Sequence, residues 1–180
     1  FGARRAGDLV MLKRNAPRLG LEVSAMASVM QDGERVSSTA VRRALAAGEL
    51  ARAERLLGRA YAISGRVVRG DGLGRKLGFP TANVQMKHNR PPLAGIFAVR
   101  LHGAATAPLR GVASLGVRPT VKQQGTPVLE VHALDFEGDL YRRHVRVEFL
   151  HKFRDEEKYA DLATLMRRIA LDVENARSYF

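Results

Sequence analysis

The sequence contains no cysteine and no tryptophan, and aromatic residues make up only 6% of its 180 positions. The lack of cysteine excludes disulfides, cysteine–zinc sites and thiol nucleophiles, and it agrees with a reducing, cytoplasmic location. No apolar run approaches the roughly 18 residues that a membrane span requires, and no secretory signal is visible, so no membrane partner is expected. Because the chain begins with Phe1 inside patterned sequence, we expect it to be a fragment of a longer protein.

Acidic residues are also scarce relative to basic ones. Lys and Arg number 30 against 18 Asp and Glu, which gives a net charge of +12. This charge attracts anions, and three explanations stay open: nucleic acid, a phosphorylated small molecule, or a generally basic proteome. The basic residues are scattered through both halves, and few aromatic side chains are available to stack on bases. Composition therefore argues against nucleic acid as the partner.

Residues 1 to about 60 have the texture of an α/β segment. The patterns predict a helix, a buried strand and two further helices, at residues 7–19, 21–30, 40–47 and 49–57. Pro17 is expected to end the first helix early, and residues 31–34 to form a turn. The hydroxyl groups of residues 37–39 can cap the second helix, and Gly58 is placed to end the third.

From Tyr61 onward the pattern changes to short strands. Five segments rich in Val, Leu, Ile and Phe are separated by Gly, Pro, Asp and Asn, at residues 61–68, 95–101, 109–115, 128–135 and 144–150. No helical pattern intervenes, so antiparallel pairing is favoured, and a small closed barrel leaves no unpaired edge. Apolar residues then recur every three or four positions from Tyr159 to Ala176, which predicts a helix with Asp161 as N-cap. We expect its apolar stripe to pack outside the barrel.

A glycine-rich stretch, residues 70–83 (GDGLGRKLGFPTAN), is the most informative part of the sequence. Glycines let a backbone approach a ligand closely and direct N–H groups at phosphate oxygens, and basic side chains add charge to such a cradle. The loop supplies six candidates of these two kinds: Gly70, Gly72, Gly74, Gly78, Arg75 and Lys76. It is neither a Walker loop, because no Gly-Lys-Ser/Thr follows, nor a dinucleotide fingerprint, because a strand should follow. A mobile hairpin loop without a ligand explains the glycines at least as well.

Two further observations point to phosphate chemistry. Pro80 fixes the backbone after the loop, and in extended chain Thr81 and Asn83 lie on one face. Their neutral oxygens suit Mg²⁺, which keeps water and substrate phosphate oxygens as its other ligands, although an ordinary Thr/Asn turn is an equal alternative. On the strand 128–135, Glu130 lies among apolar residues, where a carboxylate is costly unless it is paired or functional. Such a carboxylate can accept the proton of an attacking hydroxyl, but a surface ion pair is equally compatible.

The five histidines show no metal-ligand spacing and are interpreted as structural or surface residues.

Taken in their order along the chain, these motifs resemble those of the riboflavin kinases. Besides the 70–83 loop, the resemblance rests on residues 95–99 (GIFAV), 116–120 (GVRPT), 129–132 (LEVH), 135–136 (DF), 140–141 (LY) and 153–156 (FRDE). It covers residues 60–180. Residues 1–59 resemble the end of the FMN adenylyltransferase domain of bacterial bifunctional FAD synthetases, through residues 1–8 and 36–42. The earlier motif of that domain, Gly-x-Phe-Asp-Gly-x-His-x-Gly-His, is absent from the sequence, so this chain is not expected to adenylylate FMN.

The resemblance implies a fold that is mainly β with α: a six-stranded antiparallel Greek-key barrel plus a C-terminal helix, preceded by an incomplete α/β nucleotidyltransferase segment. It implies ATP-dependent phosphorylation of riboflavin to FMN, with ATP/ADP and riboflavin/FMN as ligands and Mg²⁺ as cofactor. Thr81 and Asn83 correspond to the Mg²⁺–ATP ligands, Glu130 to the catalytic base, and Arg154 to the flavin side. Residues 70–79 correspond to the flap that covers the nucleotide, and Pro80 is also expected to bind ATP.

The sequence departs from the family pattern at two positions. Ser114 stands where Asn is commoner, and Arg142 where Gly commonly follows Leu-Tyr. Neither departure touches Thr81, Asn83 or Glu130. Two alternatives remain open: a basic β-barrel that binds nucleic acid without catalysis, and a regulatory or FMN-binding fragment without turnover. The oligomeric state stays undetermined.

Overall fold

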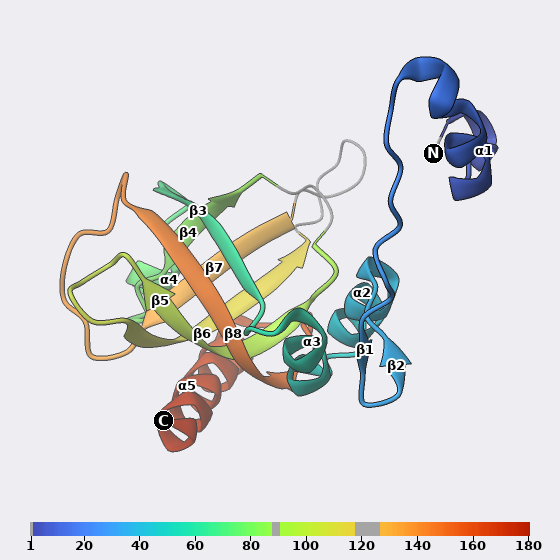
Figure 1. Ribbon diagram of the computed structural model, residues 1–180. Coiled ribbons are helices and arrows are strands. Elements are labelled where there is room, and N and C mark those ends of the chain that lie inside the picture. The colour runs from blue at the N-terminus through green and yellow to red at the C-terminus, as the bar shows by residue number, and fades with distance from the viewer. Residues whose placement is uncertain (1, 88–90, 118–126) are drawn as a thin grey trace. The chain divides into compact units, whose positions relative to one another are not determined.

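The computed structural model describes residues 2–87, 91–117 and 127–180, which form parts of two compact units, residues 1–35 and 36–180 (Figure 1). This division at residue 35 separates two groups of residues that each make contacts mainly among themselves. The boundary predicted between residues 59 and 60 instead separates the parts that resemble two different families, and it stays a prediction. Within the described ranges, no helix is long and apolar enough to cross a lipid bilayer.

The first unit contains little regular structure. Its elements are η1 (Ala3–Arg5), α1 (Leu9–Asn15), η2 (Pro17–Leu19), β1 (Met30–Gln31) and β2 (Glu34–Arg35). Asp8 caps α1 by accepting a hydrogen bond from the backbone N–H of Met11, and Pro17 ends the helix region as expected by opening a 3₁₀ turn. The predicted turn at 31–34 connects β1 and β2.

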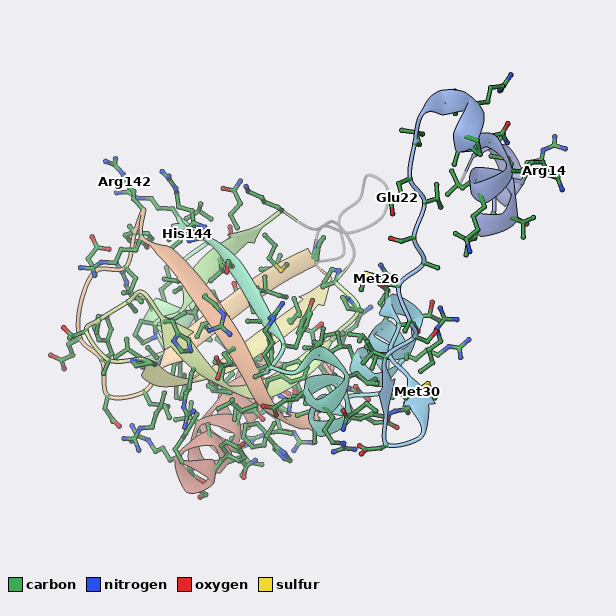
Figure 2. All side chains as sticks on the ribbon, in the orientation of Figure 1. Arg14, Glu22, Met26, Met30, Arg142 and His144 are labelled. Atoms are coloured by element: carbon green, nitrogen blue, oxygen red, sulfur yellow. The ribbon has the colours of Figure 1, made fainter. Side chains whose placement is uncertain are left out.

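The predicted buried strand at 21–30 is wrong. Only Met30 enters a strand, and large side chains in the segment are exposed, Met26 to 93% (both residues are labelled in Figure 2). A strand is stable only when a neighbouring strand pairs with its N–H and C=O groups. Among the described residues β1 pairs with β2 alone, so nothing holds residues 21–29 in a sheet.

The second unit opens with two short helices that the sequence predicts well, α2 (Ser38–Ala46) and α3 (Leu50–Leu57). Ser37 caps α2, because its hydroxyl accepts a hydrogen bond from the N–H of Ala40 at 3.1 Å. Gly48 and Gly58 have φ values of 76° and 70°, the left-handed conformation that glycine adopts without strain at helix ends.

A closed antiparallel barrel of six strands follows (Figure 1). The strands are β3 (Ala62–Val68), β4 (Ala82–Met86), β5 (Gly95–His102), β6 (Leu109–Val117), β7 (Pro127–Ala133) and β8 (His144–Arg154). Their order around the barrel is β3-β4-β7-β6-β5-β8, and pairing of β8 with β3 closes it. Five of these strands follow from the sequence pattern, whereas β4 was implied only by the family resemblance. The predicted fold class is confirmed for this unit.

Alternate residues of the strands fill the barrel interior, where Phe97 and Phe149 meet edge to face with ring centres 5.3 Å apart. The C-terminal helix α5 (Leu162–Tyr179) packs outside the barrel against β5 and β6, as predicted. Its contact with the barrel forms a second apolar cluster: Ile96, Val112, Leu134, Val173 and Ala176. Asp161 caps α5 by accepting from the N–H of Thr164 at 2.8 Å, so the predicted N-cap is confirmed.

Candidate active site

Three polar residues form a transverse row on the outer face of the barrel. In the strand register Asn83 of β4 lies opposite Glu130 of β7, and Glu130 lies opposite Ser114 of β6. Directly opposed residues share a face, and the sequence neighbours of Glu130, Leu129 and Val131, point into the core. The row therefore lies outside the core.

The row borders a cavity of about 460 Å³ between the barrel wall, the glycine-rich loop and α5. This volume is within the range of about 300–1,000 Å³ typical of small-molecule sites. Polar residues of its lining include Thr81, Asn83, Ser114, Glu130 and Arg154. Apolar residues of its lining include Ile96 and Val112 of the barrel and Leu165 and Ile169 of α5. The cavity can thus hold a ligand that carries both polar and apolar groups.

The glycine-rich loop lies against the two residues that follow it. A Cβ added at Gly70 would lie 2.6 Å from Cγ of Asn83, and one added at Gly74 would lie 3.2 Å from Oγ1 of Thr81. The loop contains a short helical turn, α4 (Leu73–Lys76), and the N–H of Phe79 donates to the carbonyl of Gly74 at 2.8 Å. Only glycine leaves room for this packing.

The predicted ATP-binding residues of the loop are not all at the cavity. Gly72 and Gly74 line it, together with Thr81 and Asn83. The other five predicted residues, Gly70, Arg75, Lys76, Gly78 and Pro80, do not. The side chains of Arg75 and Lys76 are exposed on the short helical turn. In this conformation of the loop, these five residues do not reach the cavity, and their predicted nucleotide-binding roles stay predictions.

The donor set suits Mg²⁺ held jointly by protein and substrate. Thr81 and Asn83 offer a hydroxyl and an amide oxygen at the same cavity, beside glycines that leave room for both side chains. Among the described residues, no group of three His, Cys, Asp or Glu side chains could hold a metal ion by itself. Mg²⁺ usually completes its octahedron with water and phosphate oxygens, so two neutral protein oxygens at a cavity fit it.

Arg154 lines the cavity, but its guanidinium is engaged by a residue that the sequence analysis missed. Nε donates to Oδ1 of Asp172 at 2.9 Å, and Nη2 donates to Oδ2 at 2.6 Å. Asp172 is 5% exposed, and its hydrogen bond raises the pKa of Arg154 above the usual arginine range, although burial opposes this. The pair fastens the end of β8 to α5. An acidic residue beside Val173, within the apolar stripe of the last helix, was the signal available in the sequence.

A second missed residue, Glu156, covers part of the row. The hydroxyl of Ser114 donates to Oε1 of Glu156 at 2.8 Å, and the carboxylate lies over Gly116, where any side chain would overlap it. Glu156 lines the same cavity as Glu130. The departure from the family at Ser114 thus has a structural partner on the segment between β8 and α5.

A third missed residue is His132, which was interpreted as structural or surface. Its Nδ1 lies 2.8 Å from the carbonyl oxygen of Pro80, and its ring meets that of Phe79 edge to face. His132 also lines the cavity. The structure does not describe His88 or the motif residues 118–120, which the sequence analysis also mentions.

The closed barrel, the glycine-rich loop and the row of Asn83, Glu130 and Ser114 form a small-molecule site of a kind that suits a phosphotransferase. The family model described as Flavokinase, riboflavin kinase, matches residues 57–180. The chain therefore belongs to the riboflavin kinase family. The match begins near the predicted boundary and includes all six strands and α5.

Full-length relatives carry a second activity in their names. The chain is 47% identical to the bifunctional riboflavin kinase/FMN adenylyltransferase of Escherichia coli K12 over 183 residues, covering 100% of this chain and 57% of that protein. It is 49% identical to the enzyme of the same description from Pseudomonas fluorescens over 180 residues, covering 99% of this chain and 57% of that protein. The chain thus spans little more than half the length of these curated relatives.

Among solved structures, a crystal structure described as a macrolide-efflux protein from Streptococcus pneumoniae superposes with a TM-score of 0.75. It is 29% identical and covers 98% of this chain and 57% of that one.

Proposed function

We propose that this chain transfers the γ-phosphoryl group of ATP to the terminal ribityl hydroxyl of riboflavin, producing FMN and ADP. The observation that carries the proposal is the row of Asn83, Glu130 and Ser114, which faces the glycine-rich loop in one cavity. Pairing of β4 with β7 sets Glu130 opposite Asn83, at the end of the glycine-rich stretch, although the two lie nearly fifty residues apart in the sequence.

Glu130 is proposed as the catalytic base. Its carboxylate accepts a hydrogen bond from the ribityl hydroxyl and directs that oxygen at the γ-phosphorus. The new O–P bond forms as the bond from the γ-phosphorus to the β–γ bridging oxygen breaks, and the hydroxyl proton passes to Glu130. Because phosphoryl transfer has a largely dissociative transition state, orientation of the hydroxyl counts for more than complete deprotonation.

Thr81 and Asn83 are proposed to hold Mg²⁺–ATP. When bound, Mg²⁺ neutralises charge on the phosphates. The chain's own contribution is to present two oxygens at fixed positions, since Gly70 and Gly74 pack against these side chains. We also retain the predicted nucleotide roles of Gly72, Gly78, Pro80, Arg75 and Lys76 as proposals. Such roles would require the exposed basic side chains of the flap to turn toward the phosphates.

The apolar walls suit the flavin ring system. Ile96, Val112, Leu165 and Ile169 line the cavity on the side of α5. We propose that Arg154 belongs to this flavin side and shapes it through Asp172, which connects β8 to α5. Both groups of the ion pair line the cavity.

The longer protein represented by the relatives is proposed to adenylylate FMN to FAD as well, with residues 1–59 as the end of its adenylyltransferase domain and 60–180 as the kinase domain. We propose a cytoplasmic location, because both reactions consume ATP. A nucleic-acid-binding barrel is not favoured, because it gives no reason for the carboxylate of Glu130 beside Asn83 and Ser114 at a cavity. Such a protein would bind nucleic acid with steep salt dependence and would not turn over ATP.

The direct test is to incubate the chain with riboflavin, ATP and MgCl₂ and to separate the flavins chromatographically. FMN without FAD is expected. Glu130→Gln should lower kcat by about 10²–10⁴-fold while changing the KM for ATP little, since a general base contributes about this much. Glu174→Gln, on an exposed position of α5, is the matched control and should retain activity. Wild-type kcat in Glu130→Gln would refute the base assignment, and absence of FMN with the unmodified chain would refute the proposed function.

A further inference from the structure

We infer that His132 is a positioning residue that fastens the Thr81 segment to the strand carrying Glu130. Its Nδ1 lies 2.8 Å from the carbonyl oxygen of Pro80, the residue immediately before Thr81. A carbonyl oxygen can only accept, so Nδ1 carries the proton of this hydrogen bond. In the neutral ring this fixes the tautomer and leaves Nε2 without a proton.

The hydrogen bond lies where the backbone ladder stops. β4 begins at Ala82, and its last pair with β7 in this direction joins Ala82 to Val131. Pro80 has no N–H, so its carbonyl is its only backbone group able to hydrogen-bond. The imidazole of His132 therefore continues the connection between the two chain segments beyond their regular pairing. Thr81 is held between the end of the ladder on one side and this side-chain hydrogen bond on the other.

The same ring also contacts the flap. The rings of His132 and Phe79 meet at 82° with centres 6.0 Å apart, and the N–H of Phe79 donates to the carbonyl of Gly74 at 2.8 Å. A continuous series of contacts thus runs from the Glu130 strand through His132 and Phe79 to the glycine-rich loop. His132 and Glu130 lie two residues apart on one face of β7, so one strand carries both the proposed base and this attachment.

The consequence for the reaction rests on the proposed function, in which Thr81 helps to hold Mg²⁺–nucleotide. Loss of the hydrogen bond should free residues 79–81 and weaken nucleotide binding, while leaving the Glu130 carboxylate on its strand. The expected pattern is a raised KM for ATP at fixed Mg²⁺ with a smaller change in kcat. A residue acting directly on the chemistry would instead lower kcat.

Three substitutions separate the hydrogen bond from the ring. His132→Phe keeps an aromatic edge without the donor, and His132→Ala removes both. His132→Asn places an amide nitrogen close to the position of Nδ1 and should therefore restore the hydrogen bond to Pro80. The control is His144→Ala, an exposed histidine on β8 that does not line the cavity. Binding is measured by calorimetry with Mg²⁺ and AMP-PNP, a non-hydrolysable ATP analogue. Amide hydrogen exchange of residues 77–83 is measured in the free chain.

For His132→Phe and His132→Ala, we expect about three- to tenfold weaker Mg²⁺–AMP-PNP binding, the range that one neutral hydrogen bond supplies. Exchange of residues 77–83 should become faster in both, whereas His132→Asn and His144→Ala should match the unmodified chain. The exchange measurement needs no turnover, so it judges the positioning role even if the chain does not phosphorylate riboflavin. Unchanged exchange in His132→Phe would overturn the inference. So would an Asn variant as impaired as the Phe variant, or a loss confined to kcat.

Discussion

Gly70→Ala provides the sharpest test of how the glycine-rich loop and the proposed Mg²⁺ ligand Asn83 fit together. A methyl group at this position would lie 2.6 Å from Cγ and 2.7 Å from Oδ1 of Asn83. Non-bonded carbon atoms normally approach to about 3.5–4.0 Å, so the Asn83 side chain must move by about 1 Å or rotate to another conformer. The substitution therefore acts on Asn83 without changing it.

The expected loss of activity follows from the displacement of the Asn83 side chain. A misplacement of about 1 Å in a group that orients the reaction can cost about 10²-fold in rate. Stability should hardly change, because φ of Gly70 is not in the left-handed region and the crowded group is a movable side chain. Gly-to-Ala changes at compatible positions even stabilise by about 0.4–1 kcal/mol. We thus expect a loss of about 10²-fold in kcat/KM for ATP with a melting temperature near that of the unmodified chain.

The assay is a double-mutant cycle with Asn83→Ala. FMN formation is measured against ATP and Mg²⁺ concentration for the unmodified chain, both single variants and the double variant. If the methyl group acts through Asn83, adding Gly70→Ala to the Asn83→Ala background should change kcat/KM by no more than about twofold. Fully additive losses would refute the proposed contact. Unchanged activity in Gly70→Ala alone would refute the role of Asn83 itself.

Two further predictions concern the attachments of α5. Asp172→Asn should destabilise the chain by about 1.5–3 kcal/mol in urea unfolding, the range for hydrogen bonds to charged groups, because Arg154 loses its charged partner; Glu174→Gln is the control, and an equal loss there would contradict this. Arg177 donates to Asp135 at 2.7 and 3.0 Å, and this hydrogen bond lowers the pKa of Asp135. The pKa of Asp135 is lower in the folded chain than in the unfolded chain, where it is about 3.9, so ionised Asp135 stabilises the fold above that pH. This stabilisation is lost as the pH falls through the folded-state pKa. Arg177→Gln should therefore be less stable than the unmodified chain at pH 7, with the difference narrowing below about pH 4; a difference independent of pH would refute the pairing.

Several features of the fold were accessible from the sequence because they depend on local chemistry. A hydroxyl among residues 37–39 was predicted to cap α2, and Ser37 does so; Asp161 caps α5 and Gly58 ends α3, as predicted. Short apolar segments separated by Gly, Pro, Asp and Asn located five barrel strands. In β8 the alternation with polar residues also predicted which side chains are buried, namely Val145, Val147 and Phe149. β4 was not recognised from its pattern, because Ala82–Met86 is short and follows a loop rich in glycine. The strand predicted at residues 21–30 is absent over residues 21–29. Apolar residues favour a strand, but a strand forms only where a neighbouring strand pairs with it.

The groups suited to phosphate chemistry could be identified from the sequence alone: the glycine-rich loop, the hydroxyl and amide of Thr81 and Asn83, and the carboxylate of Glu130 among apolar strand residues. Whether these groups meet depends on strand register, which sequence spacing leaves open, because a shift of one residue turns every side chain to the other face. Only the tertiary structure set Asn83 opposite Glu130. It also engaged Arg154 with Asp172 and brought His132 to the carbonyl of Pro80, 52 positions away in the chain. The first and last of these contacts depend on the pairing of β4 with β7, and the ion pair depends on the packing of α5 against the outside of the barrel.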